Sequence, residues 1–294
     1  MTHPAETAEA VAFHLFETGA SGLVQDPHPQ KDDWMISRAG YEPQLDSESV
    51  RIDLESRMET VAEAFDLEQT PAIRWGYVES GDWAEKWKEG LHPIEIGERL
   101  VIKPTWCDYP DNTGRIIISL DPGMAFGTGL HATTRMCLQV LEELLRKSPD
   151  AYPEILDIGT GSGILAMAAA VLSPGAITAV DIDPEAVAVA ADNLKLNNLS
   201  QQIRMAVGGP ETLSGRFDLI LANLTANPLT GMAFAMKHLI KPGGTAVLSG
   251  LLRHQADDVL AVYQDQGFSL DERRNDEEWS ALVFVGPASI TDTP

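Results

Sequence analysis

The fold is decided by Ile155-Leu156-Asp157-Ile158-Gly159-Thr160-Gly161-Ser162-Gly163. An apolar run that is too short for a free helix carries Asp157 near its end, and three glycines then alternate with Thr160 and Ser162. Segment 164–171, which follows, is apolar throughout and rich in helix formers. A strand, a tight glycine turn and a buried helix in this order open a nucleotide-binding βαβ unit.

A carboxylate follows at the position where such a unit holds a ribose. The expected second strand, 176–180, delivers Asp181 at its carboxyl end, 22 positions after Gly159. This spacing is close to the ~20 residues typical of a carboxylate that binds a ribose diol. Asp183 and Pro184 then suit the N-cap and first position of the next helix. Together these features favour a nucleoside ligand over a purely structural turn.

The glycine spacing indicates which nucleoside is bound. A dinucleotide site needs its third glycine one place further on, so that a pyrophosphate can lie on the helix N-terminus. The tighter Gly-x-Gly-x-Gly turn found here suits a ligand whose amino-acid end crosses the loop. Asp157 would repel a phosphate and suits an ammonium group better. We therefore predict S-adenosylmethionine as the cofactor, with Asp181 accepting both ribose hydroxyls.

Composition excludes several classes of protein. The 294 residues, 44% of them hydrophobic, suggest two domains or one large one. The formal net charge of −23 argues against direct nucleic-acid binding and favours encounter with a basic macromolecule. No apolar stretch approaches the ~20 residues of a membrane span, and the N-terminus lacks the features of a signal peptide. Cys107 and Cys137 are isolated, which predicts no metal site, no disulfide and a cytoplasmic location.

The first hundred residues differ in character from the rest, since five of the six tryptophans precede residue 110. This acidic, aromatic segment suits a surface that grips a basic partner, or else an ordinary core under a solvated face. Interleaved elements predict a small α+β sandwich. We expect helices over 6–16 and 58–65, strands over 20–26, 49–54 and 73–78, and a loop over 27–46 in which 34–36 could pair. A short helix over 81–90 is either a linker or the start of the next domain.

Two further stretches could face the ligand. Segment 121–134 is glycine-rich and precedes a helix, so the hydroxyls of Thr133 and Thr134 could point into a pocket or simply cap that helix. His131 fits a structural histidine better than a base. Asn223 ends the apolar strand 217–223, and the carboxyl ends of strands in an open α/β sheet form the ligand crevice. We therefore expect Asn223 beside the cofactor. An amide cannot accept a proton at neutral pH, so its expected role is orientation.

Several blocks of the sequence together resemble those of one family. They are Trp83-Ala84-Glu85-Lys86-Trp87 with His92-Pro93, Asp121-Pro122-Gly123-Met124-Ala125-Phe126-Gly127-Thr128-Gly129, His131, Thr133-Thr134, Asp157-Ile158-Gly159-Thr160-Gly161-Ser162-Gly163, Asp181-Ile182-Asp183-Pro184 and Ala222-Asn223-Leu224. From about Gly81 onward the chain thereby resembles the PrmA family, the bacterial methyltransferases of large-subunit ribosomal protein eleven. The block around Phe126-Gly127-Thr128-Gly129 is more specific than the glycine turn.

The resemblance implies a ferredoxin-like substrate-recognition domain (1–79), a helical linker (80–92) and a class I methyltransferase domain with a Rossmann-like doubly wound sheet (93–294). It implies methylation of lysine ε-amines and of the N-terminal α-amine of that basic ribosomal protein. Cofactor contacts carried over from the family fall on Thr134, Gly159, Asp181 and Asn223, and the glycine turn adds Gly161. Alternatives are methylation of another basic protein or of a small molecule, and a non-catalytic cofactor-binding scaffold.

One departure from the family concerns the start of the chain. Family members usually carry an additional β-strand before the first helix, whereas Met1 here lies almost on the expected helix. We therefore expect a small sheet that either lacks this edge strand or fills its place with another segment.

Overall fold

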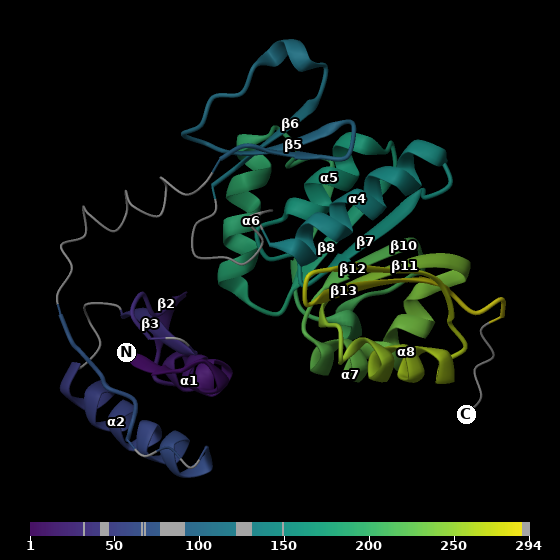
Figure 1. Cartoon of the computed structure of the whole chain (residues 1–294). Coiled ribbons are helices and arrows are strands. Elements are labelled where there is room, and N and C mark those ends of the chain that lie inside the picture. Colours follow the sequence, from purple (N-terminus) through teal and green to yellow (C-terminus); the bar gives the residue numbers. More distant parts are fainter. Residues whose placement is uncertain are drawn as a thin grey trace. The chain divides into compact units, whose positions relative to one another are not determined.

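The computed structural model describes residues 1–31, 33–41, 47–65, 67, 69–76, 92–121, 131–148 and 150–289. The chain separates into two compact units, Met1–Trp87 and Lys88–Pro294 (Figure 1). The expected helix over 81–90, most of the expected linker and the glycine-rich segment 122–130 lie outside the described residues.

The smaller unit is an antiparallel sheet with two helices. Its strands are β1 (Thr2–Pro4), β2 (Ala20–Pro27) and β3 (Trp34–Tyr41), and its helices are α1 (Ala8–Glu17) and α2 (Ser47–Ala64), with a 3-10 turn, η1, over Ala5–Thr7. The strand order is β1-β3-β2, and Thr2 also forms an isolated antiparallel bridge with Ala72. The expectation of a missing first strand is therefore wrong. Seven residues precede α1, and three of them, Thr2–Pro4, form β1, which pairs with β3.

The strand predicted over 49–54 is also wrong, because these residues begin α2. Leu54, Met58 and Val61 are 1%, 0% and 2% exposed and follow one face of a helix, whereas Ile52 is 62% exposed. Together with Val11 and Leu15 of α1 they form the core of this unit. The predicted loop over 27–46 instead contains all of β3, and the described part of 73–78 forms no strand.

The larger unit is built on a seven-stranded sheet with the order β12-β13-β11-β10-β7-β8-β9. The strands from β11 to β9 are parallel, and the antiparallel β13 lies between β11 and β12. The strands are β7 (Glu154–Ile158), β8 (Ala176–Asp181), β9 (Ile203–Val207), β10 (Phe217–Asn223), β11 (Ile240–Leu252), β12 (Ser269–Asp276) and β13 (Trp279–Val285). This is the mostly parallel, doubly wound α/β sheet that the sequence predicts.

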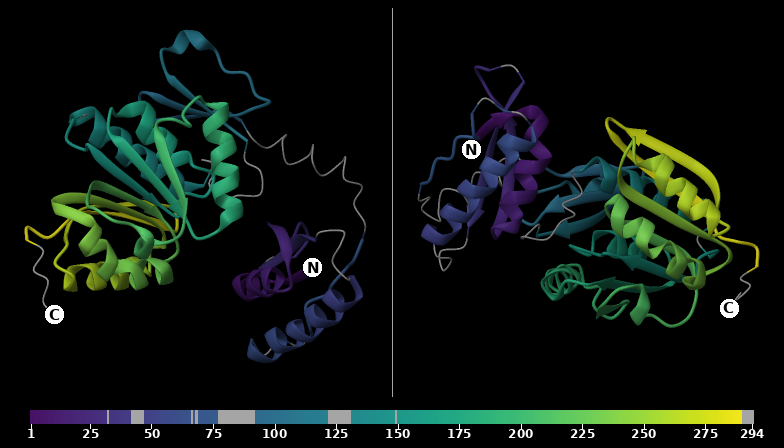
Figure 2. Two further views of the ribbon diagram at one scale, coloured as in Figure 1. Left: turned by 180° about the vertical axis from the view of Figure 1, so that it is seen from behind. Right: turned by 90° about the horizontal axis from the view of Figure 1, so that it is seen from below.

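Helices cover both faces of this sheet (Figures 1 and 2). One face carries α4 (Ala132–Lys147), α5 (Ile164–Leu172) and α6 (Pro184–Leu196), and the other carries α7 (Ala226–Leu239) and α8 (Ala256–Asp265). Two separate apolar clusters fill the space between the helices and the two faces. The short turn η3 spans Pro210–Thr212. Every parallel strand therefore ends at one edge of a sheet that is buried on both sides, which is where such folds bind ligands.

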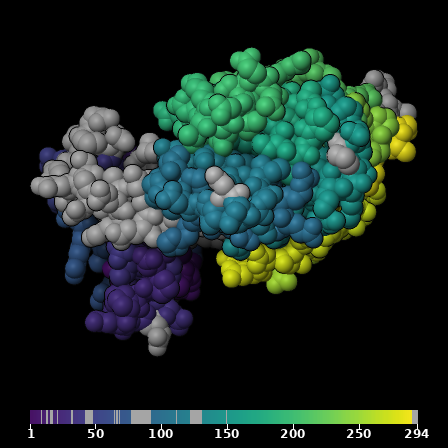
Figure 3. All heavy atoms as spheres, turned by 90° about the horizontal axis from the view of Figure 1, so that it is seen from above, coloured from purple at the N-terminus to yellow at the C-terminus, as the bar shows by residue number. Residues whose placement is uncertain are grey.

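A second, three-stranded sheet packs over α4, α5 and α6. It contains β4 (Ile94–Ile96), β5 (Leu100–Pro104) and β6 (Ile116–Leu120), with a 3-10 turn, η2, over Asp111–Thr113. Its apolar side chains join the core of the first face, and residues 92–121 form a broad part of the surface seen in Figure 3. The turn between β4 and β5 is held by the buried Glu142 of α4, whose Oε1 accepts the N–H groups of Glu98 and Arg99 at 2.9 and 2.8 Å.

Over the described residues, no helix has the length and apolarity that crossing a membrane requires. In the same part of the chain, no three histidine, cysteine, aspartate or glutamate side chains gather as metal ligands would.

Candidate functional site

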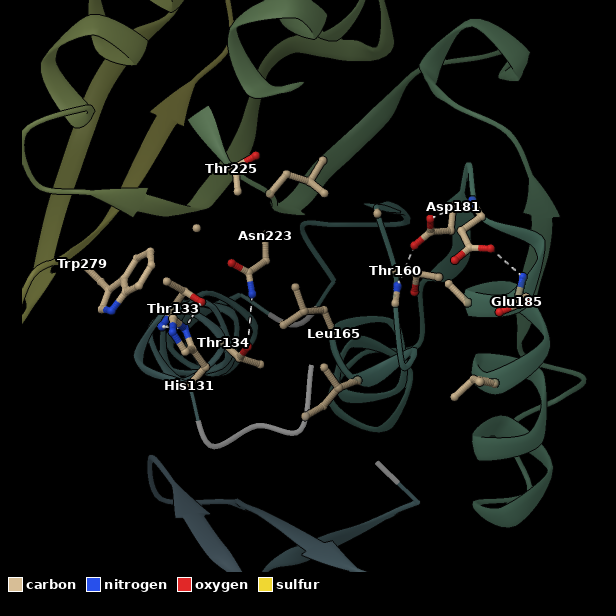
Figure 4. Close-up of a pocket in the computed structure, with 18 residues that line it drawn as sticks. His131, Thr133, Thr134, Thr160, Leu165, Asp181, Glu185, Asn223, Thr225 and Trp279 are labelled. Carbon is tan, nitrogen blue, oxygen red and sulfur yellow. Dashed lines mark hydrogen bonds between the residues drawn. The ribbon is translucent and has the colours of Figure 1, made fainter. Parts of the chain in front are cut away.

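A cavity of about 640 Å³ opens at the carboxyl edge of the parallel strands, a size typical of small-molecule sites. Its wall is formed by the N-terminal turn of α4, the glycine turn after β7, the end of β8, the end of β10 and the start of β13 (Figure 4). Asp181 lies at one end and Trp279 at the other, with Asn223 between them. All five residues predicted as site residues line this cavity, namely Thr134, Gly159, Gly161, Asp181 and Asn223.

The glycine turn has a backbone that only glycine adopts readily. Gly159, Gly161 and Gly163 all have positive φ, at 69°, 54° and 83°. The N–H groups of Gly159 and Thr160 both donate to the carbonyl of Val180, which ties the turn to β8. A Cβ on Gly159 would lie 2.4 Å from a methyl of Leu224, so any larger residue here would also have to displace that side chain.

Asp181 is tied to the same turn. Its Oδ2 accepts the N–H of Gly161 at 2.9 Å, and its Oδ1 accepts the N–H of Asp183 at 3.1 Å. A carboxylate has about four lone-pair sites, so both oxygens retain the capacity to accept a further hydrogen bond from a ligand. The helix signals are confirmed, since Asp183 caps α6 through the N–H of Glu185 and Pro184 occupies the first turn.

Asp157 lies beneath the turn and does not line the cavity. It is fully buried, and its Oδ2 accepts the hydroxyl of Thr160 at 2.7 Å and the N–H of Ala166 at 3.2 Å. Burial raises the pKa of this carboxyl to about 7. Asp157 therefore fastens the turn to the first turn of α5 through its Oδ2, whereas its buried Oδ1 has no hydrogen-bond partner among the described residues. The expected contact between Asp157 and a ligand ammonium stays a prediction.

The N-cap of α4 is His131, not Thr133 or Thr134 as the sequence suggested. The Nδ1 atom of His131 accepts the N–H of Thr133 at 3.4 Å and lies 2.8 Å from the Thr133 hydroxyl. Burial lowers the pKa of this imidazole, which favours the neutral ring that can accept these bonds. Thr133 and Thr134 lie in the first turn of the helix and are fully buried.

Trp279 is a wall residue that sequence reasoning missed. Its indole contacts the His131 imidazole in an edge-to-face arrangement, with 4.6 Å between ring centroids and 72° between planes. Because β13 runs antiparallel to β11, the first residue of β13 lies at the edge where the parallel strands end. The sequence does show a tryptophan at the start of the last strand. Placing that tryptophan at the ligand edge, however, requires knowing that the strand runs antiparallel to its neighbour.

Asn223 is oriented by α4. Its Nδ2 donates to the hydroxyl of Thr134 at 3.1 Å, across 89 positions of sequence. Its Oδ1 is buried and has no hydrogen-bond partner among the described residues. A buried acceptor without a partner is costly, so its presence at a cavity indicates a ligand that donates a hydrogen bond there.

The chain is similar to a group of proteins that share one name. Residues 1–286 match the family model described as ribosomal protein L11 methyltransferase (PrmA). A protein named ribosomal protein L11 methyltransferase from Syntrophotalea carbinolica is 35% identical, over 97% of this chain and 96% of its own length. One of the same name from Pelobacter propionicus is 39% identical over 96% of this chain and 94% of its own.

A solved structure agrees with these matches. The crystal structure of ribosomal protein L11 methylase from Lactobacillus delbrueckii subsp. bulgaricus superposes with a TM-score of 0.60 and 30% identity, covering 67% of this chain and 98% of that one. The glycine turn, Asp181 and Asn223 thus lie in a chain whose similarity to these methyltransferases extends over almost its whole length. The chain belongs to the ribosomal protein L11 methyltransferase (PrmA) family.

Proposed function

We propose that this protein is an S-adenosylmethionine-dependent protein N-methyltransferase that methylates lysine ε-amines and the N-terminal α-amine of ribosomal protein L11. The observation that carries the proposal is a cavity, in a chain of this family, whose lining holds the carboxylates of Asp181, Asp183 and Glu185. Among its described lining residues, Asp181 supplies a carboxylate and Asn223 a buried amide oxygen, and none is lysine or arginine.

This wall fits S-adenosylmethionine better than a diphosphate. The cofactor brings a ribose diol and an ammonium group, both of which donate hydrogen bonds, whereas a diphosphate only accepts them. Asp181 would hold the ribose, and the turn at Gly159 and Gly161 would let the backbone approach the ligand closely. Apolar side chains such as Ile164 and Leu165 line the same cavity and suit an adenine ring.

The chain contributes mainly alignment and the removal of water. The cofactor, when bound, supplies a methyl group already activated by a sulfonium sulfur. A solvated lysine amine has a pKa of about 10.4 and must lose its proton before its lone pair can attack. Asn223 cannot take that proton, and we assign it to accepting a hydrogen bond from an amine, either of the substrate or of the cofactor. Thr134 fixes the orientation of this amide by accepting the N–H of its Nδ2, which leaves the Oδ1 without a protein donor among the described residues. The proton leaves to solvent.

The two compact units support a division of labour. We propose residues 1–79 as the substrate-recognition domain, 80–92 as a helical linker and 93–294 as the methyltransferase domain. The chain carries a net charge of −23 and its substrate is basic, so the two attract each other. The protein would act in the cytoplasm, where ribosomal proteins are made.

The test is methyl transfer to a defined substrate. Purified protein is incubated with methyl-labelled S-adenosylmethionine and purified ribosomal protein L11, and the label is located by mass spectrometry of peptides. We expect methylated lysines and a methylated N-terminus on L11. Label that appears only on another protein of a cell lysate, or only on small molecules, would replace the proposed substrate. Binding of cofactor with no transfer to any of these would favour a scaffold.

A further inference from the structure

The glycine turn, which lines the cavity, lies close to the point where the chain leaves the three-stranded sheet. The glycine turn follows β7 of the seven-stranded sheet, whereas the chain leaves β6 of the three-stranded sheet at Asp121, ten residues before the N-cap of α4. Helix α6 contacts both sheets, and it lies beside β5 and β6 in Figure 1. Any residue that binds both the turn and the end of β6 sets the position of the turn relative to the three-stranded sheet.

Asn193 of α6 makes both contacts. Its Nδ2 donates to the carbonyl of Ser162 at 3.0 Å, inside the glycine turn, and its Oδ1 accepts the N–H of Asp121 at 3.0 Å. The side chain is 1% exposed, so water does not compete for either bond. No cavity-lining atom among the described residues belongs to Asn193, which therefore acts only through the backbone that it holds.

We propose that Asn193 is a positioning residue for the cofactor cavity, fixing the glycine turn relative to the carboxyl end of β6. The inference rests on the proposed function, because it assigns the residue to cofactor binding. Ser162 lies between Gly161 and Gly163, and the N–H of Gly161 is held by Asp181. A shift of the Ser162 carbonyl therefore disturbs the adjoining part of the turn, whose Gly161 N–H is hydrogen-bonded to the Asp181 carboxylate.

The same helix supplies a matched control. Asn197, the C-cap of α6, lies one turn after Asn193 and binds β6 itself, since its Oδ1 accepts the N–H of Ser119 at 2.8 Å and its Nδ2 donates to the Ser119 carbonyl at 2.7 Å. The same Nδ2 also lies within hydrogen-bonding distance of the Asn193 carbonyl and the Met167 sulfur, both of which belong to helices and not to the glycine turn. A purely structural role for these amides predicts that both fasten α6 to β6 and that neither affects the ligand.

The experiment compares Asn193→Leu with Asn197→Leu in the full chain. Calorimetry measures the affinity for S-adenosylhomocysteine, thermal unfolding reports stability, and steady-state kinetics separate KM for S-adenosylmethionine from kcat. We expect both variants to lose thermal stability, and only Asn193→Leu to bind S-adenosylhomocysteine about tenfold more weakly, from the loss of a buried hydrogen bond. Its KM for S-adenosylmethionine should rise by a similar factor while kcat changes little.

The outcomes separate this inference from the function on which it rests. If the leucine variants do not fold, Asn193→Ala and Asn197→Ala give the same comparison, because a smaller side chain leaves room for water at the freed groups. Equal affinities for the two variants, or an unchanged affinity in the Asn193 variant, would overturn the positioning role while the proposed function stands. Wild-type protein that binds no S-adenosylhomocysteine would overturn both.

Discussion

The two ends of the Asn223 amide have different tasks. The Nδ2 is engaged with Thr134, and the buried Oδ1 remains for a ligand. We expect Asn223→Ala to lower kcat by about 100-fold, because a misaligned amine reacts far more slowly, while circular dichroism shows an unchanged fold. Asn227→Ala is the control, since Asn227 is exposed on α7. A folded Asn223→Ala variant with wild-type turnover would remove this residue from the mechanism.

Asp157 should make stability depend on pH. Burial raises its folded-state pKa from 3.8 to about 7, so between these values the folded protein holds a proton that the unfolded chain releases. This contribution is complete below pH ~4 and is lost as the pH rises through about 7. The free energy of unfolding of the wild type should therefore fall relative to that of Asp157→Asn, by up to about 1.4 kcal/mol per pH unit.

Urea denaturation of the wild type and Asp157→Asn from pH 5 to 8.5 measures this difference. Parallel stability curves for the two proteins would show that the carboxyl titrates at the same pH in the folded and unfolded states.

Four of the five predicted site residues have a place that follows from chain order, whereas Thr134 was predicted from the family resemblance. Gly159, Gly161 and Asp181 belong to one βαβ unit, and Asn223 ends a strand of the same sheet, so all four had to meet at its carboxyl edge. The position of Trp279 could not be predicted in the same way, because it depends on the antiparallel insertion of β13. The N-cap of α4 is His131 because His131 is the residue with an extended backbone, at φ −67° and ψ 139°. The sequence alone does not show at which residue the backbone becomes helical.

Among the elements, α2 shows which apolar positions carry stability. Leu54 is 1% exposed in the core of the smaller unit, whereas Ile52 is 62% exposed on the same helix. We expect Leu54→Ala to lower the free energy of unfolding of this unit by about 3 kcal/mol and Ile52→Ala to change it by less than about 0.5 kcal/mol. Chemical denaturation followed by circular dichroism measures both. Similar losses in the two variants would favour a strand-like burial of this segment.

The same helix explains why the smaller unit was harder to predict than the larger one. Val50, Ile52 and Leu54 alternate as a strand would, and only the continuation to Met58 and Val61 reveals the helical period. The larger unit contains apolar segments bounded by glycine turns, and these segments show no helical period that competes with their interpretation as strands. The short strand β4 and the half-exposed β9 were not predicted, since three to five residues with mixed burial carry little periodic signal.

At the scale of the whole molecule, charge should govern encounter with the substrate and not cofactor binding. The net charge of −23 attracts a basic protein over a distance that added salt shortens. Raising NaCl from 50 to 300 mM should increase KM for ribosomal protein L11 several-fold and change the affinity for S-adenosylhomocysteine less than twofold. Kinetics and calorimetry at matched salt test this. A KM that does not respond to salt would mean that long-range attraction contributes little.

Trp279 gives the cavity a built-in optical reporter. Its indole forms part of the wall and lies edge-on against the imidazole of His131, so a molecule entering the cavity changes the surroundings of a fluorescent ring. Of the six tryptophans, it is the one among the described lining residues. Phenylalanine at the other five positions would leave a protein whose emission follows cavity filling directly, without a dye and on the timescale of a stopped-flow mixing experiment.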